Sequence, residues 1–369
     1  MDLLSFALLL SGCLYCCSVM WLWCGLGRAK PDRVEERSLE RPSVSVVVAA
    51  RDEQELLPDC LQALSEQDYQ GDYEVVVVND RSRDNTWQIL VEKAALWPQL
   101  KPVQAAGELR YRCPKKSALA QGIEVSSGTI LLFTDADCRP PSDWLESMVA
   151  HFAPEVGLVA GYARPDPVNG WAAQLLAVDN IAVGALGAGS IAMGRPLSCT
   201  GRNLAYRRQV YDQVGGFAEI GHLIGGDDVY FMRLVAAGGA WRMVFNREAE
   251  ILSSPPQIKV GEVVQQKLRH AAKGGHYKGG AFLLAAGIYV FHFILAWALL
   301  RTVWTPEWNV WLWGVWSVRW FVDLMLLARM SGAAERKLLW SLPAMEVVYI
   351  PYVLIFTVVG RLGWFRWKP

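Results

Sequence analysis

Hydrophobic residues fall into long runs near both ends of the chain and into short runs between them. Residues 3–26 contain no charged side chain and are long enough to cross a bilayer as one helix. Three more long apolar runs follow near the other end of the chain, at residues 281–300, 311–330 and 338–359. This pattern predicts transmembrane helices on both sides of a central region of different composition.

The short runs of the central region are typical of buried strands that alternate with helices. Residues 43–49, 74–79 and 130–133 are rich in Val, Leu or Ile, and a helical pattern follows each of the first two runs. This alternation favours βαβ units and a parallel sheet, so the predicted fold class is α/β. Residues 182–194, which are rich in Gly and Ala, fit either a flexible loop or a packing helix.

The changes of pattern along the chain define five segments. Basic residues from Arg28 to Arg37 follow the first apolar run, whereas only Asp2 precedes it, so the central region is expected on the cytoplasmic side. The predicted segments are an N-terminal transmembrane helix (1–26), a linker (27–41), an α/β domain (42–256), an amphipathic interfacial segment (257–280) and a C-terminal membrane region of two to three spans (281–366).

The last apolar run does not determine on which side of the membrane the C-terminus lies. Pro343, Glu346 and Pro351 interrupt this run, and basic residues follow it from Arg361 to Lys368. If all the runs cross the membrane, these basic residues lie outside, against the positive-inside rule. Either the last run is re-entrant or interfacial, or the rule fails there.

Charge adds three expectations. Lys+Arg and Asp+Glu are equal at 36 each, so net charge gives no argument for nucleic-acid binding. Arg319 and Asp323 stand four residues apart within an apolar run and are expected to pair inside the protein. A basic amphipathic stretch fits a helix on anionic lipid, and its cations are Lys259, Lys267, Arg269, Lys273 and Lys278.

Acidic residues stand directly after the predicted strands, where ligands bind in sheets of this kind. Asp52 and Glu53 follow the first strand, Asp80 follows the second, and Asp135 and Asp137 follow the third. Two carboxylates one residue apart suit a hard divalent cation such as Mg²⁺ or Mn²⁺, which shares its oxygen ligands with substrate phosphates. A lone Asp-x-Asp is more often a plain turn, so companion motifs must decide.

Five companion motifs and the Asp-x-Asp itself occur along the chain, and in this order the six resemble those of family-2 glycosyltransferases. They are Ser43–Glu53, Asn79–Thr86, Lys115–Gly122, Thr134–Asp137, Gly226–Asp228 and Gln266–Arg269. The resemblance implies that the α/β domain is a catalytic domain of the GT-A fold, with a Rossmann-like sheet that binds a nucleotide-sugar. The flanking apolar runs resemble the membrane-attached branch of that family.

The resemblance implies roles for the residues of the donor site. The residues expected to bind the nucleoside are Ala50, Asp52, Glu53 and Asp80. Lys115 would face the diphosphate, although Pro114 replaces the usual Gly, and Lys116 is expected to be solvated. Asp137 would be the direct metal ligand, and Asp135 would face the ribose or a metal-bound water.

The resemblance also implies an acceptor side. Asp228 would be the catalytic base and Asp227 takes the place of a Glu beside it, while helix N-capping is the alternative role for either residue. Gln266 and Arg269 match the family's Gln-x-x-Arg motif, in which Arg269 would contact the diphosphate or a gating loop. The candidates near the acceptor are Arg202 and Asn203, in a Gly-x-Asn-x-Ala segment.

The resemblance and the apolar runs together imply an inverting, hexosyltransferase-type glycosyltransferase that is integral to the cytoplasmic membrane and faces the cytoplasm. It would move a sugar from a nucleotide-sugar, with a UDP-sugar favoured, to a lipid or lipid-linked acceptor of a cell envelope glycan, with Mg²⁺ or Mn²⁺ as cofactor. The alternative is a processive polysaccharide synthase, which is disfavoured because His270 stands where those enzymes have Trp. A catalytically silent scaffold would have lost carboxylates that this chain retains.

Overall fold

The computed structural model describes residues 2–28, 41–254, 260–273, 277, 279–305 and 309–364. The chain forms two compact units. We call Arg28–Pro167 with Leu186–Pro255 the sheet unit, and Met1–Gly27, Val168–Ala185 and Pro256–Pro369 the helical unit. The predicted α/β domain thus contains one segment, residues 168–185, that belongs to the helical unit.

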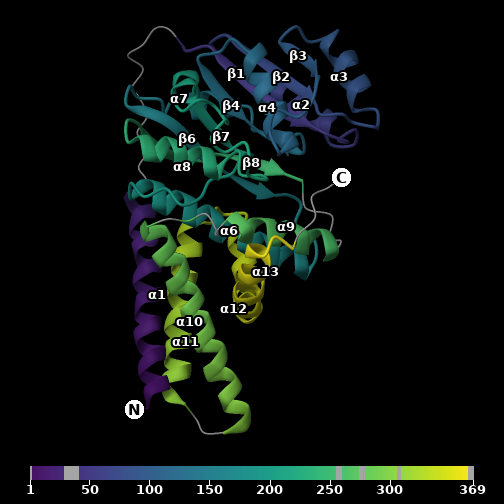
Figure 1. Ribbon diagram of the computed structural model, residues 1–369. Helices are drawn as coiled ribbons and strands as arrows, with labels where there is room; N and C mark the ends of the chain where they lie inside the picture. The colour runs from purple at the N-terminus through teal and green to yellow at the C-terminus, as the bar shows by residue number, and fades with distance from the viewer. Residues whose placement is uncertain are drawn as a thin grey trace. The chain divides into compact units, whose positions relative to one another are not determined.

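The sheet unit is built on one sheet of eight strands in the order β3-β2-β1-β4-β7-β6-β8-β5 (Figure 1). Strand β1 runs parallel to β2 and β4, and β2 runs parallel to β3, whereas β7 is antiparallel to both β4 and β6. The carboxyl ends of β1, β2 and β4 therefore meet at one edge of the sheet. The strands are β1 (Val44–Ala50), β2 (Tyr73–Asn79), β3 (Leu100–Gln104), β4 (Ile130–Phe133), β5 (Cys138–Arg139), β6 (Val156–Pro165), β7 (Leu204–Arg207) and β8 (Arg242–Ser253).

Alternate valines of β1 and β2 face opposite sides of the sheet, so both faces are buried. On one face Val76 and Val78 pack with Ala118 of α4, and their neighbours in the strands face the main core. Helix α4 lies close to the sheet because Gly122 has no side chain, since a Cβ there would come within 2.6 Å of Val47. The helices of this unit are α2 (Leu57–Ser65), α3 (Thr86–Ala94), α4 (Pro114–Val125), α5 (Trp144–Val149), α7 (Arg208–Gln213) and α8 (Val229–Gly238).

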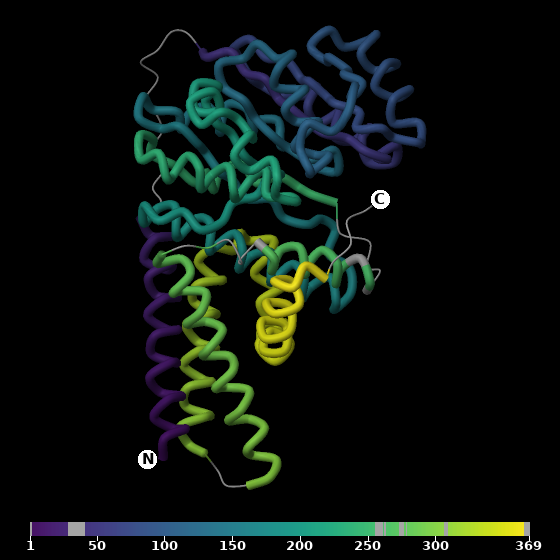
Figure 2. Tube along the Cα trace, viewed as in Figure 1, coloured from purple at the N-terminus to yellow at the C-terminus, as the bar shows by residue number. Residues whose placement is uncertain are grey.

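The long helices α1, α10 and α11 of the helical unit lie side by side in a bundle (Figures 1 and 2). Arg301 near the end of α10 pairs with Asp2 before α1, with 2.8 Å between Nη1 and Oδ2. At the other end of α1, the guanidinium of Arg329 in α11 lies 4.1 Å from the centre of the Trp23 ring. Helix α10 is therefore antiparallel to α1, and α11 is parallel to it. The bounds are α1 (Leu3–Arg28), α10 (Gly279–Trp304) and α11 (Val310–Met330).

The last apolar run stays beside helices α6 and α9 at both of its ends. The Ser341 hydroxyl donates to Gln174 Oε1 of α6 at 3.1 Å, and a Cβ at Gly360 would lie 2.9 Å from a backbone carbonyl oxygen of α9. Helices α6 and α9 are joined by an ion pair between Asp179 and Lys267. The elements concerned are α6 (Trp171–Ala192), α9 (Val260–Lys273), η2 (Arg336–Ser341), α12 (Leu342–Pro351), η3 (Tyr352–Phe356) and α13 (Thr357–Arg361).

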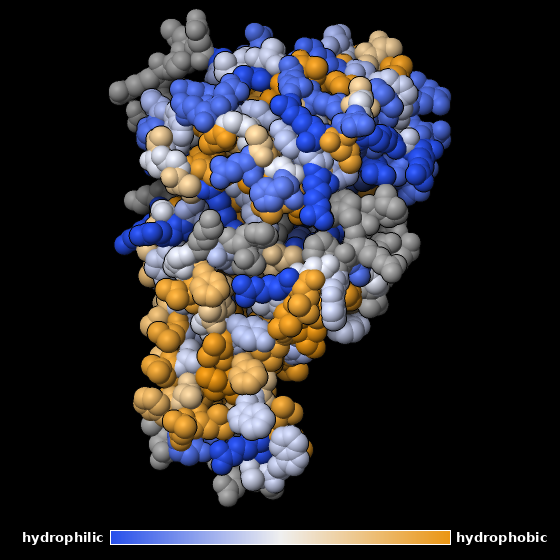
Figure 3. Space-filling view, viewed as in Figure 1, coloured by the Kyte–Doolittle hydropathy of each residue, from blue (hydrophilic) through white to orange (hydrophobic). Residues whose placement is uncertain are grey.

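Five helices within the described residues are long and apolar enough to cross a membrane, namely α1, α6, α10, α11 and the run Arg336–Arg361. Large apolar side chains of the bundle are exposed, such as Leu3 at 83%, Leu283 at 69% and Val303 at 74%. Figure 3 shows many hydrophobic side chains on the surface over the bundle of α1, α10 and α11. Exposed apolar area of this extent fits a lipid environment. Of the two interpretations of residues 182–194, the helix is correct, because α6 includes most of them.

A buried ionic cluster lies inside the helical unit. Arg319 of α11 is only 1% exposed, and its Nη2 lies 2.8 Å from Glu346 Oε2 of α12, while its Nε lies 3.6 Å from Asp323 Oδ2. The Tyr15 hydroxyl of α1 donates to Asp323 Oδ2 at 2.8 Å. The predicted pairing of Arg319 with Asp323 inside the protein is confirmed, and Glu346 is an additional partner.

Candidate active site

Two loops that follow β1 and β2 support each other at the sheet edge. Asp52 has a φ of 55°, its N–H donates to Ser82 Oγ at 3.0 Å, and its Oδ1 accepts the N–H of Arg83 at 2.7 Å. The N–H of Glu53 donates to Thr86 Oγ1 at 2.9 Å. Asp52 and Glu53 therefore hold the two loops in shape, and one carboxylate oxygen of Asp52 already serves the fold.

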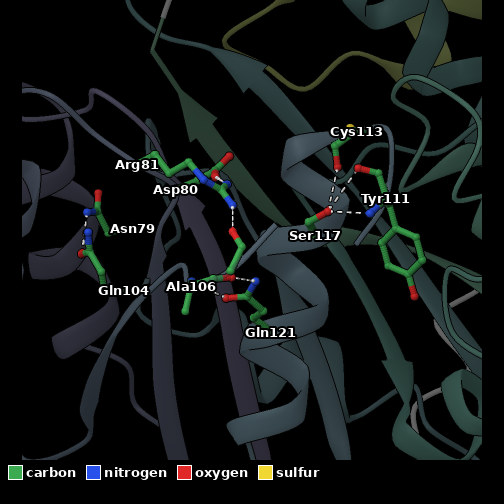
Figure 4. A network of polar contacts seen from close by, with 10 residues as sticks. Asn79, Asp80, Arg81, Gln104, Ala106, Tyr111, Cys113, Ser117 and Gln121 are labelled. Atoms are coloured by element: carbon green, nitrogen blue, oxygen red, sulfur yellow. Dashed lines mark hydrogen bonds and ion pairs between the residues drawn. The ribbon is translucent and has the colours of Figure 1, made fainter. Parts of the chain in front are cut away.

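Asp80 is the buried carboxylate of this edge. Its N–H donates to the Ala50 carbonyl at 2.8 Å, and its side chain is 5% exposed. Arg81 Nη1 donates to Asp80 Oδ1 at 2.6 Å, and Arg81 Nη2 donates to the Gly107 carbonyl at 3.0 Å (Figure 4). Arg81 thus links Asp80 to the loop that follows β3. No local pattern in the sequence marks Arg81 for this role, because its partner Gly107 stands 26 residues later.

Lys115 at the start of α4 joins two pairs of carboxylates. Its Nζ lies 2.5 Å from Asp135 Oδ1 and 3.6 Å from Asp227 Oδ2. Burial lowers the pKa of the Lys115 ammonium, but the carboxylates of Asp135, Asp227 and Asp228 outweigh burial and raise the pKa well above its usual range. Residues from three separate sequence motifs therefore meet at one ammonium group.

The charge of Asp135 acts on the neighbouring carboxyl group of Asp137. Burial raises the pKa of Asp137 and the Asp135 carboxylate raises it further, while Arg202 lowers it. Arg202 is held in place, since its Nη1 donates to Ser253 Oγ at 2.8 Å. The sequence suggested Arg202 only as an acceptor-side candidate, and the structure places its charge close enough to act on Asp137.

The Asp135–Asp137 pair has the donor chemistry of a divalent-cation site. Both side chains offer hard carboxylate oxygens, the donors that suit Mg²⁺ and Mn²⁺. Among the described residues, no group of three or more His, Cys, Asp or Glu side chains could hold a metal ion. Two carboxylates one residue apart suit a cation that takes its other ligands from a diphosphate and water, as Mg²⁺ and Mn²⁺ do.

Asp228 is the N-cap residue of α8 and is held by two backbone donors. Its Oδ1 accepts the Val229 N–H at 2.6 Å, and its Oδ2 accepts the Gly201 N–H at 3.2 Å. Gly201 lies against both aspartates of this pair, since a Cβ there would come within 3.2 Å of Asp227 Oδ2 and 3.7 Å of Asp228 Cβ. The capping role is therefore observed, and it orients the carboxylate beside Asp227.

Two residues near the site have structural roles. Lys116 was expected to be solvated, and this prediction is wrong: the side chain is fully buried, and its Nζ donates to the carbonyls of Ile220 at 2.7 Å and Leu223 at 3.0 Å. These acceptors lie more than 100 residues later, with separations of 104 and 107. Asn203, an acceptor-side candidate, is also fully buried, and its Nδ2 donates to the Tyr162 carbonyl at 2.9 Å.

The Gln-x-x-Arg motif belongs to the helical unit. Gln266 and Arg269 lie on α9, and their contact with a donor remains a prediction. The expected contact of Lys267 with lipid head groups is wrong, because its ammonium pairs with Asp179 of α6. Two other cations of that stretch lie outside the described residues, Lys259 and Lys278.

Comparison with known proteins yields a family and several relatives. The model of a family described as glycosyl transferase family 21 matches residues 4–362. Glycosyltransferase AglE of Haloferax volcanii is 30% identical over 238 residues, which are 62% of this chain and 71% of that protein. Beta-monoglucosyldiacylglycerol synthase of Synechocystis is 35% identical over 113 residues, 30% of this chain and 23% of that protein.

A solved structure extends the similarity to the whole chain. It is the mannosyltransferase PcManGT from Pyrobaculum calidifontis in complex with GDP-Man and Mn²⁺, with a TM-score of 0.65 and 21% identity. The alignment covers 98% of this chain and 99% of that one. At this identity the likeness speaks for the fold, and it confirms the predicted α/β architecture of the GT-A type.

Proposed function

Because the chain belongs to glycosyl transferase family 21 and is a glycosyltransferase, we propose that it transfers a sugar from a UDP-sugar to a lipid or lipid-linked acceptor. In this proposal the transfer inverts the anomeric configuration and takes place at the cytoplasmic face of a membrane. The predicted membership of the GT-A glycosyltransferases is confirmed. The lipid acceptor is supported by the exposed apolar helices and by the similarity to a glucosyldiacylglycerol synthase. The nucleotide-sugar donor is supported by the fold shared with PcManGT.

One observation carries the proposal: Lys115 bridges Asp135, from the pair after β4, and Asp227, from the pair before α8. A sugar transferase needs a group that stabilises the leaving diphosphate and a base that prepares the acceptor, and both must reach the same anomeric carbon. The contacts of Lys115 support a site in which both pairs of carboxylates would act on one sugar.

On the donor side, the nucleoside would lie against Ala50, Asp52, Glu53 and Asp80. Asp80 offers a carboxylate oxygen at the end of β2, where it can accept a hydrogen bond from a base or a ribose hydroxyl. Asp135 and Asp137 would hold Mg²⁺ or Mn²⁺ at the diphosphate. The bound cation supplies positive charge that stabilises the leaving diphosphate as the sugar–phosphate bond breaks.

On the acceptor side, Asp228 would be the general base, with Asp227 beside it. Asp228 would remove the proton from the acceptor hydroxyl while that oxygen forms its bond to the anomeric carbon. The bond from this carbon to the diphosphate oxygen breaks on the opposite face, and the electron pair leaves with the diphosphate. One displacement of this kind inverts the anomeric configuration. The backbone N–H groups of Val229 and Gly201 would hold the Asp228 carboxylate in place.

We propose that the last apolar run does not cross the bilayer. Helices α1, α10 and α11 run up, down and up, which returns the chain to the side where α1 ends. Both ends of the last run contact the α6–α9 pair, so Arg361 at its end stays on that side, in agreement with the positive-inside rule. An impermeant thiol reagent should label Thr305→Cys from outside the cell but not Leu362→Cys. Labelling of both from outside would contradict the re-entrant arrangement.

The function is tested with the purified full chain in lipid bilayers and a panel of nucleotide-sugars. An α-linked UDP-sugar should yield a β-linked glycolipid in the presence of Mn²⁺, as read by NMR of the product. Addition of a single sugar supports the proposal, whereas a ladder of products would favour the processive synthase. A product that retains the anomeric configuration would exclude the base role of Asp228.

A further inference from the structure

We propose that Lys115 is an exchangeable counter-ion: it binds Asp135 while the donor is absent, and it moves to the donor diphosphate when donor and divalent cation bind together. The inference rests on the proposed function, because it assumes a nucleotide-sugar site at Asp135 and Asp137. Its consequence is a coupling between the cation and the nucleotide, which each bind weakly alone and tightly together.

The geometry allows this exchange without movement of the backbone. The Lys115 ammonium lies 2.5 Å from Asp135 Oδ1, and the two side chains are 31% and 30% exposed, so both are reachable by a ligand. The next residue, Lys116, is anchored in the protein by the carbonyls of Ile220 and Leu223, which fixes the start of α4. Only the flexible four-carbon stem of Lys115 has to change its rotamer.

When Lys115 leaves Asp135, both charged groups need a new partner of opposite charge. The Lys115 ammonium interacts with the carboxylates of Asp135, Asp137, Asp227 and Asp228, and Arg202 acts on Asp137. A cation that binds through Asp135 must compete with the Lys115 ammonium for the same carboxylate. A diphosphate brings new negative charge to which the ammonium can move, and this relieves the competition.

The test is a titration of the full chain in detergent with MnCl₂, followed by calorimetry and by Mn²⁺ electron paramagnetic resonance. In the wild-type protein, saturating UDP should tighten Mn²⁺ binding by about 5- to 150-fold, the usual range of ligand coupling, and Mn²⁺ must tighten UDP binding by the same factor. GDP is titrated in parallel as a second nucleotide. In Lys115→Gln, Mn²⁺ alone should bind about fivefold or more tightly than in the wild type, and the gain from UDP should shrink to about twofold or less.

Two variants control for loss of charge and loss of fold. Lys101→Gln removes a lysine that lies 2.5 Å from Glu74 in the same sheet, and it should leave the coupling unchanged. Lys115→Met keeps most of the stem without the charge and should behave as Lys115→Gln does, so a misfolded Gln variant does not end the test. Thermal unfolding shows which variants are folded.

The outcomes separate this inference from the proposed function. If Lys115→Gln and Lys115→Met bind Mn²⁺ alone no more tightly than the wild type and keep the full gain from UDP, Lys115 is not an exchangeable counter-ion. If the wild-type protein binds neither Mn²⁺ nor nucleotide when both are present, the proposed donor site itself is wrong.

Discussion

Asp228→Asn should abolish sugar transfer while leaving donor binding and the fold intact. In the structure both carboxylate oxygens of Asp228 accept backbone hydrogen bonds, at 2.6 Å from Val229 and at 3.2 Å from Gly201. Asparagine has one oxygen and can keep only one of these bonds. It is as good an N-cap as aspartate, so we expect it to keep the Val229 bond and lose the longer one to Gly201.

The expected magnitudes decide between a structural and a catalytic effect. Loss of one hydrogen bond costs about 1 kcal/mol, and loss of the charge at the start of α8 costs about 0.3–1 kcal/mol. Typical domains are stable by about 5–15 kcal/mol, so nearly all of the Asp228→Asn protein stays folded. A general base contributes about 10²- to 10⁴-fold in rate, or about 3–5 kcal/mol of activation free energy. The change in rate should therefore far exceed any change in folded fraction.

The assay compares Asp228→Asn with Asp228→Ala under saturating donor and Mn²⁺. If Asp228 is the base, both variants lose transfer by 100-fold or more and bind UDP as the wild type does. Asp228→Ala should also lose about 1 kcal/mol of stability from the missing cap. If the residue only caps the helix, Asp228→Asn transfers at nearly the wild-type rate and only Asp228→Ala is impaired. That second pattern would refute the assignment.

Three further predictions concern stability and the cofactor. Arg319→Met should destabilise the helical unit by about 3–5 kcal/mol because it leaves buried carboxylates unpaired. The triple variant that also carries Asp323→Asn and Glu346→Gln should recover part of this stability in thermal unfolding. Equal melting temperatures for all variants would contradict this prediction. Burial raises the pKa of Glu74, but hydrogen bonds, the largest from Lys101, outweigh burial and lower the pKa to about 2. Its contribution of about 1–2 kcal/mol is therefore fully present above pH 4.5, the ordinary value, and is lost as the pH falls towards 2, so Glu74→Gln should flatten the acid limb of denaturant-unfolding curves. Chelation by EDTA should abolish transfer, and Mn²⁺ should restore it; full activity in EDTA would exclude the metal.

The strand ends were predictable because a run of valine and leucine shows the length of a buried strand, and the first polar residue after the run shows where the strand ends. Asp80, Asp135 and Asp137 follow such strands directly, so their common edge follows from the parallel order of the strands. The pair Arg319 and Asp323 was predictable for a similar reason, because a helix places residues four apart on one face.

Partners that are distant in sequence were not predictable in this way. Lys116 looked like any surface lysine beside Lys115, and only carbonyls more than 100 residues later explain its burial. Glu346 of α12 forms an ion pair with Arg319 of α11, and Lys267 of α9 forms an ion pair with Asp179 of α6. No local pattern encodes these pairs, since each depends on how separate elements pack.

The proposed function depends on the metal-dependent transfer of a sugar from a nucleotide to a lipid. The most direct test incubates the purified chain, in bilayers of total membrane lipid, with radiolabelled UDP-sugars one at a time, with Mn²⁺ or with EDTA. We expect that one sugar enters the lipid phase only with Mn²⁺, and that its linkage is inverted relative to the donor. If no nucleotide-sugar, GDP-linked donors included, labels any lipid while Asp135, Asp137 and Asp228 are intact, the proposed lipid acceptor is wrong.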